Sequence, residues 1–143
     1  MHGNRYKKIY SSFKRGEVVY VDLGAQSHGV QGGIRPCIVV SSNAGNHCRA
    51  PQITVCPLTT KIKDKPVHVK IESHDVTGYQ LKQTSEMLAE DIMTVSKDAV
   101  RGKVGFIKED TDIMKQINHA VMLHLGITEY KESKEVKSYN ETR

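Results

Sequence analysis

The fold is decided first by residues 17–23, which read Glu17-Val18-Val19-Tyr20-Val21-Asp22-Leu23. Val19, Val21 and Leu23 alternate with the positions between them, and β-branched side chains dominate the stretch. An alternation with a period of two predicts a half-buried β-strand. Further along, residues 37–40 form a continuous apolar run, which predicts a strand buried on both faces.

Four more segments predict strands: residues 52–58, 66–71, 85–95 and 103–107. Because proline has no N–H to donate, Pro57 should mark the edge or the end of its strand. Apolar side chains at spacings of three and four predict a helix over residues 110–125, with Asp110 as N-cap and Gly126 ending it in a left-handed conformation. Several short strands followed by one amphipathic helix predict a mainly β domain of the α+β class.

Composition narrows the class of protein. A chain of 143 residues suits one domain, and no apolar run approaches the ~20 residues of a membrane helix. The basic N-terminus lacks the apolar segment of a secretory signal, so we expect a cytoplasmic protein that does not bind membranes.

The three cysteines, Cys37, Cys48 and Cys56, form no C-x-x-C pair, which disfavours a disulfide framework or a zinc ribbon. Cys37 and Cys56 should be buried as small apolar side chains.

The charge is moderately basic, at +5 from 21 Lys and Arg against 16 Asp and Glu. Such an excess fits a polyanionic partner such as nucleic acid or an acidic peptide, although a merely soluble basic surface would look the same.

Two polar segments could carry chemistry. Residues 29–36 form a glycine-rich loop in which Gly32 and Gly33 would let backbone N–H groups approach an anion, and Arg35 adds a planar fork suited to phosphate. The alternative is a tight turn with a solvated arginine. Thr59, Thr60 and Lys61 leave the third predicted strand and match the groups that contact phosphates, although such threonines also bond their own backbone.

Four segments, in the same order and spacing, resemble the MazF/PemK family of toxin–antitoxin ribonucleases. They are residues 15–23 (family pattern R-G-D-[IV]-x-x-[AV]-[DN]-[LF]), 31–36 (Q-x-G-x-R-P), 39–43 ([VI]-[VI]-[SQ]-[NS]-[ND]) and 55–60 (V-x-[PA]-[IL]-T-[ST]). The likeness covers about residues 14–126, between a basic arm at residues 1–13 and a polar tail at residues 127–143.

The resemblance implies an SH3-like barrel of the CcdB/PemK type with a C-terminal amphipathic helix, usually as a homodimer. It implies a toxin that cuts single-stranded mRNA at short sequences without metal or cofactor. The ribose 2′-hydroxyl attacks the adjacent phosphorus, leaving a 2′,3′-cyclic phosphate and a 5′-hydroxyl. A toxin of this kind should be accompanied by an acidic, MazE-like antitoxin, which we expect to cover the basic RNA groove.

By position, Arg35 and Thr59 correspond to the family's catalytic arginine and threonine. Arg35 would neutralise the charge that develops on the phosphate oxygens, and the Thr59 hydroxyl would donate a further bond. The expected RNA-binding residues are His28, Gln31, Gly32, Gly33, Thr60, Lys61, Lys63 and Lys65.

The chain departs from the family at three positions. Val30 stands where many members carry a glutamate considered as a general base, so another group must take the 2′-hydroxyl proton, or Arg35 must share that task. His28 is a candidate by its ordinary pKa, the alternative being an exposed loop histidine. Asp91 and Met93 replace a common glutamine and a common basic residue, which puts sequence preference and nearby dimer contacts in doubt.

The remaining histidines show no metal-ligand spacing, and we expect them to be structural or solvated: His47, His68, His74, His119 and His124. Two other functions stay open. One is a CcdB-like toxin that binds DNA gyrase without catalysis, although Arg35 and Thr59 favour the ribonuclease. The other is an inactive barrel that only binds RNA or antitoxin.

Overall fold

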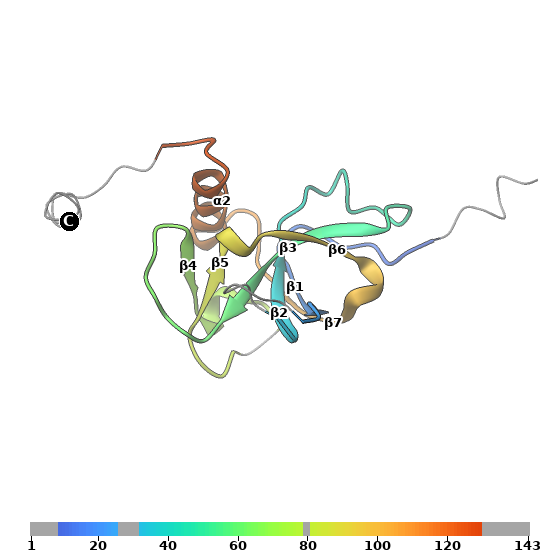
Figure 1. The fold of residues 1–143 in the computed structure, drawn as a ribbon, viewed down its shortest axis with the longest axis horizontal. Coiled ribbons are helices and arrows are strands. Elements are labelled where there is room, and N and C mark those ends of the chain that lie inside the picture. The colour runs from blue at the N-terminus through green and yellow to red at the C-terminus, as the bar shows by residue number, and fades with distance from the viewer. Residues whose placement is uncertain (1–8, 26–31, 79–80, 130–143) are drawn as a thin grey trace, which may run out of the picture.

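The computed structural model describes residues 9–25, 32–78 and 81–129, and within them a mainly β architecture with one α-helix (Figure 1). Its strands are β1 (Glu17–Asp22), β2 (Ile34–Val39), β3 (Gln52–Thr59), β4 (His68–Ile71), β5 (Ser85–Leu88), β6 (Met93–Ser96) and β7 (Val100–Phe106). The 3₁₀ helices are η1 (Ser73–Asp75), η2 (Ala89–Asp91) and η3 (Lys97–Ala99), and helix α2 (Asp112–His124) follows the last strand. The predicted α+β, mainly β class is confirmed.

The strands pair antiparallel in the order β4-β5-β3-β2-β1-β7, and β6 pairs with β3 beside this path. A bridge between Thr77 and Phe106 brings the segment after η1 against β7. The two ends of the sheet therefore approach each other, although no strand ladder closes it into a barrel within the described ranges. Helix α2 stands beside β4 and β5 at one end of the molecule (Figure 1).

The prediction that Pro57 marks a strand edge or end was wrong, because Pro57 lies inside β3, opposite Cys37 of β2. On its other side, β3 pairs with β6 over residues 52–55 and with β5 over residues 58–59. Pro57 falls in the interval between these two partners, where a missing N–H costs no ladder hydrogen bond.

Strand β2 begins earlier than predicted. The strand was expected to start at residue 37 after Arg35 and Pro36 ended the loop, but both residues already pair with β1, opposite Val21 and Tyr20. The turn before the strand is closed by two backbone hydrogen bonds, from Leu23 to Gly33 and from Gly33 to Gly24. Arg35 therefore extends from a hydrogen-bonded strand and not from a loop.

Other boundaries shifted for local reasons. The single strand expected over residues 85–95 is two strands, β5 and β6, separated by the 3₁₀ turn η2, which lets the chain pair with two different stretches of β3. Strand β7 starts three residues before the predicted position, strand β4 starts two residues after it, and β1 and β3 differ from prediction by one residue at their ends.

Helix α2 begins one residue later than predicted. Its N-cap is Thr111 and not Asp110, because the Thr111 hydroxyl accepts the backbone N–H of Met114 at 3.3 Å. Gly126, with φ 73°, follows the helix in the left-handed conformation that was predicted. The first helical residue, Asp112, is acidic, which suits the positive end of the helix dipole.

Two clusters of buried side chains lie on the two faces of the sheet. The larger one joins strand residues such as Ile38, Cys56 and Leu58 to Ile113 and Ile117 of α2. The smaller one contains Cys37, as well as Phe13 from the segment predicted to be an arm. Cys37 and Cys56 are buried and free as predicted, and burial raises the pKa of each thiol to about 12. Among the described residues no helix is long and apolar enough to cross a membrane.

Candidate functional site

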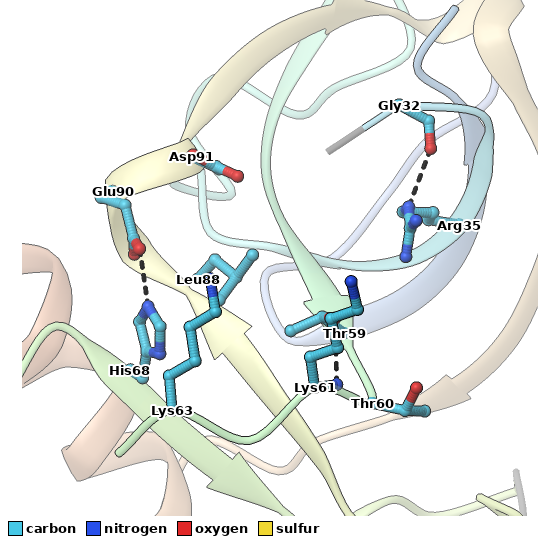
Figure 2. A pocket seen from close by; sticks show the side chains of 10 residues that line it. All are labelled: Gly32, Arg35, Thr59, Thr60, Lys61, Lys63, His68, Leu88, Glu90 and Asp91. Atoms are coloured by element: carbon cyan, nitrogen blue, oxygen red, sulfur yellow. Dashed lines mark hydrogen bonds and ion pairs between the residues drawn. The ribbon is translucent and has the colours of Figure 1, made fainter. Parts of the chain in front are cut away.

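A hollow of about 470 Å³ opens where the beginning of β2 meets the end of β3. Its size falls in the range of ~300–1,000 Å³ that is usual for ligand sites. The lining residues come from four stretches of chain and are Gly32, Arg35, Thr59, Thr60, Lys61, Lys63, His68, Leu88, Glu90 and Asp91 (Figure 2). The sheet thus brings together the two polar segments singled out in the sequence.

Arg35 is held by its own turn. Its Nε–H donates to the carbonyl oxygen of Gly32 at 2.8 Å. Among the described residues, neither terminal amino group of Arg35 has a hydrogen-bond partner, so both are available to an anion in the hollow. A guanidinium fixed at Nε and open at its two ends is suited to bidentate binding of phosphate.

Thr59 ends β3 and is almost completely buried, with 7% of the residue exposed. Its Oγ1 accepts the backbone N–H of Lys61 at 3.2 Å. Because a hydroxyl also has one hydrogen to donate, this bond leaves the Thr59 hydroxyl hydrogen for a ligand in the hollow. The alternative that Thr59 bonds the neighbouring backbone is therefore observed, and this bond does not exclude contact with a phosphate.

The wall across the hollow from Arg35 carries His68 bonded to Glu90 (Figure 2), and a second carboxylate, Glu86, bonds the other ring nitrogen of His68. The ring of His68, with 1% of the side chain exposed, lies 2.8 Å from Glu86 through Nδ1 and 2.6 Å from Glu90 through Nε2. Each of these bonds needs a proton between its two heavy atoms, so the chain of three side chains is held together by two protons. The other oxygen of Glu90 is buried without a partner among the described residues.

The Glu86 carboxylate is buried, with 1% of the residue exposed, and it remains ionised. Burial alone would raise the pKa of Glu86. The backbone N–H groups of Lys63 and Asp64, together with His68, outweigh burial and hold the pKa below the usual value of 4.5. The result is a fixed negative charge behind the wall of the hollow.

The hollow carries charges of both signs. Arg35, Lys61 and Lys63 supply positive charge, whereas Glu90 and Asp91 are carboxylates of η2. Figure 2 places Arg35 and Glu90 on opposite sides, with Thr59 below and between them. A phosphate is attracted to the side of Arg35, because carboxylates repel it from the other.

The structure gathers six of the ten predicted site residues around the hollow: Gly32, Arg35, Thr59, Thr60, Lys61 and Lys63. Gly33 and Lys65 are described but do not line it. His28 and Gln31 lie outside the described residues, as does Val30. His68, which was expected to be structural or solvated, is buried, bonded to two carboxylates and part of the lining. Within the described ranges no group of three or more histidine, cysteine or carboxylate side chains is arranged to hold a metal ion.

Sequence reasoning missed Glu86, His68 and Glu90 as neighbours of the site. One signal was present, since Glu86 is the only charged residue in Ser85–Leu88, a strand whose four residues are all buried. A charge in such a position requires partners. The identity of those partners depends on the pairing of β5 with β4, which no local pattern specifies.

The sequence model of the family of PemK-like, MazF-like toxins of type II toxin–antitoxin systems matches residues 14–125 of this chain. This chain belongs to that toxin family. The match covers the hollow, the sheet around it and helix α2. The resemblance drawn from four short segments is therefore confirmed over most of the chain.

Relatives of this PemK/MazF-family chain match it over most of their own length. Endoribonuclease MazF of Staphylococcus saprophyticus is 32% identical over 116 residues, which cover 80% of this chain and 92% of the relative. A mycobacterial endoribonuclease, solved in complex with its cognate antitoxin, is 27% identical with a TM-score of 0.64, covering 83% of this chain and all of that one. MazF from Deinococcus radiodurans, at 22% identity and a TM-score of 0.66 over 81% of this chain and 98% of its own, shows the same fold.

Proposed function

We propose that this chain is the toxin of a type II toxin–antitoxin system, a sequence-specific endoribonuclease that cuts single-stranded mRNA without a metal. The observation that carries the proposal is the shared hollow of Arg35 and Thr59, with Lys61 and Lys63 beside them. Membership of the toxin family and similarity to a relative named as an endoribonuclease support it.

In the proposed reaction the ribose 2′-hydroxyl attacks the adjacent phosphorus and the bond to the 5′-oxygen breaks. The 2′-hydroxyl proton passes to a base, and the departing 5′-oxygen takes up a proton, which leaves a 2′,3′-cyclic phosphate and a 5′-hydroxyl. The two terminal amino groups of Arg35 stabilise the negative charge on the phosphate oxygens, and the Thr59 hydroxyl donates a further bond to them.

The RNA strand would be held mainly through its backbone. Lys61, Lys63 and Lys65 lie in the segment between β3 and β4 and offer three cations to successive phosphates. Splayed bases would be read beside the hollow, where Asp91 occupies the position of the family's common glutamine. A carboxylate accepts hydrogen bonds but donates none, so this exchange is expected to alter the recognised sequence.

Two proposed RNA contacts and one proposed role fall outside the described residues. Gln31 and His28 precede Gly32 in the sequence, and His28 is the proposed support for proton transfer in place of the glutamate that Val30 replaces. Replacing His28 with alanine is expected to change the pH–rate profile of cleavage. An unchanged profile would remove His28 from the mechanism.

The proposed partners follow from the same surface. An acidic, MazE-like antitoxin would cover the lysines and Arg35 and so prevent RNA from entering, in line with the mycobacterial relative that was solved with its cognate antitoxin. We further propose a cytoplasmic homodimer. Addition of the antitoxin should suppress cleavage, and an antitoxin that binds without reducing cleavage would contradict the covering of the groove.

The deciding experiment is cleavage of a long single-stranded RNA by the purified protein in excess EDTA, with Arg35→Ala and Thr59→Ala beside it. Discrete cuts with cyclic phosphate ends, lost in both variants, are expected. Binding of RNA without cutting would instead indicate an inactive barrel. If neither occurs, inhibition of gyrase supercoiling would test the CcdB-like alternative.

A further inference from the structure

Glu86 is a buried, ionised carboxylate that the proposed reaction does not use. It sits on β5, opposite Thr59 of β3, but its oxygens are turned to other partners. Ionised groups at such depth are costly unless every oxygen is bonded. Each oxygen of Glu86 does have a partner, and these partners belong to the segment that carries the lysines and to the wall of the hollow.

The first attachment is to the backbone between β3 and β4. Glu86 Oε1 accepts the N–H of Lys63 at 2.9 Å, and Oε2 accepts the N–H of Asp64 at 3.0 Å. Asp64 has a φ of 52°, a left-handed conformation that aspartate adopts more readily than most residues other than glycine. Glu86 holds the backbone in this conformation by bonding to two consecutive N–H groups.

The second attachment is to the wall. Oε1 of Glu86 also contacts His68 Nδ1, and His68 Nε2 contacts Glu90, which lines the hollow. The backbone N–H of His68 in turn donates to the carbonyl oxygen of Lys65 at 2.9 Å. Both ends of the segment over residues 63–65 are thus joined to Glu86, directly or through His68.

We propose that Glu86 is a positioning residue for RNA binding, which fixes the backbone at Lys63 and Asp64 so that the Lys63 ammonium group meets an RNA phosphate. The inference rests on the proposed ribonuclease function. Lys61 provides an internal comparison, because its backbone N–H is bonded to Thr59 and not to Glu86. Glu86 should therefore control the contribution of Lys63 and leave that of Lys61 unchanged.

The test is a double-mutant cycle on binding of a single-stranded RNA that carries 2′-O-methyl riboses and so cannot be cut. Binding is measured over a series of salt concentrations. Loss of one phosphate contact with a single strand is expected to reduce the slope of log K against log salt by about 0.7. Lys63→Ala should show this reduction in the wild-type background and little or none in the Glu86→Gln background. Lys61→Ala should show it in both backgrounds.

Met87→Ala is the matched control for lost stability. Met87 is the next residue of β5, is fully buried and belongs to the larger core cluster. Its truncation therefore weakens the packing of the same strand but leaves the bonds of Glu86 to Lys63 and Asp64 in place. In the Met87→Ala background, Lys63→Ala should still reduce the slope of log K against log salt by the full amount. If Met87→Ala abolished this reduction as Glu86→Gln does, Glu86 would only contribute to stability, and the proposal would be overturned.

Amide hydrogen exchange of the wild-type protein gives a second measurement for the case that Glu86→Gln does not fold. The amides of Lys63 and Asp64 should exchange slowly, because both are bonded to a buried carboxylate. Exchange of both at the rate of an unstructured chain would overturn the proposal.

The two proposals fail in different ways. Suppose that the wild-type protein binds and cuts RNA, and that Lys63→Ala reduces the salt slope equally in the wild-type and Glu86→Gln backgrounds. This result would overturn the positioning role of Glu86 and leave the ribonuclease function intact. A wild-type protein that neither binds nor cuts RNA would overturn both.

Discussion

Arg35 donates its Nε–H to the carbonyl oxygen of Gly32 at 2.8 Å, across the turn that leads into β2. The bond uses the one guanidinium nitrogen that is not needed for two-point contact with a phosphate. It also restricts the side chain before any ligand arrives, which lowers the entropy lost on binding. Pairing of Arg35 with Val21 of β1 fixes the backbone to which the side chain is attached.

Arg35→Lys should reduce the single-turnover rate of RNA cleavage by about 10²-fold or more, since a lysine keeps the charge but not the fork. Its effect on the RNA dissociation constant should be much smaller. Arg101→Lys is the control, because Arg101 lies at the surface of β7 and pairs with Asp22. A cleavage rate for Arg35→Lys equal to that of the control would show that only the charge matters.

Thr59→Val should also reduce the cleavage rate by about 10²-fold, because it removes a donor to the phosphate oxygens while keeping the shape of the side chain. Thr59→Ser keeps the hydroxyl and should retain most of the activity. Thr94→Val is the matched control, since Thr94 is an exposed residue of β6 that bonds Thr54. Equal rates for Thr59→Val and Thr59→Ser would exclude a role of the hydroxyl in the reaction.

The stability of the protein should depend on the charge of Glu86 in acid. Its pKa is lowered in the folded state, so its contribution is present above the unfolded value of about 4.5 and is lost as the pH falls through the lower folded value. The difference in free energy of unfolding between wild type and Glu86→Gln should therefore narrow below pH ~4.5. Urea unfolding between neutral pH and pH ~3 measures it, with His68 and Glu90 present in both proteins. A constant difference would contradict the lowered pKa.

Gly16→Ala should destabilise the fold by at least about 2 kcal/mol, through strain and crowding. Gly16 has a φ of 97°, and an added Cβ would lie 2.3 Å from the carbonyl oxygen of Ile107. Gly102→Ala is the control, because a Cβ there meets nothing within 4 Å. Urea midpoints measure both, and a stable Gly16→Ala would mean that the backbone can move away from Ile107.

Much of the fold could be predicted from local pattern. The strand at β1 and the helix α2 were found because their apolar residues repeat at the periods of two and 3.6 that these structures require. The predicted strand boundaries were wrong where the strand's pairing partner, and not its own sequence, decides where the strand ends. Pro57 is tolerated inside β3 only because β3 changes partners beside it, and η2 interrupts one predicted strand for the same reason.

The sequence by itself determined the class of fold, the family and the residue types of the site, because alternation, helical spacing and the segments around Arg35 and Thr59 are local and ordered along the chain. Only the tertiary structure decided that Arg35 and Thr59 share one hollow. It alone joined Glu86 to the backbone of Lys63 and to His68. These contacts join residues 18 to 23 positions apart in the sequence and depend on the pairing of β4 with β5. The energy of such pairing depends on register and burial, which no single segment contains.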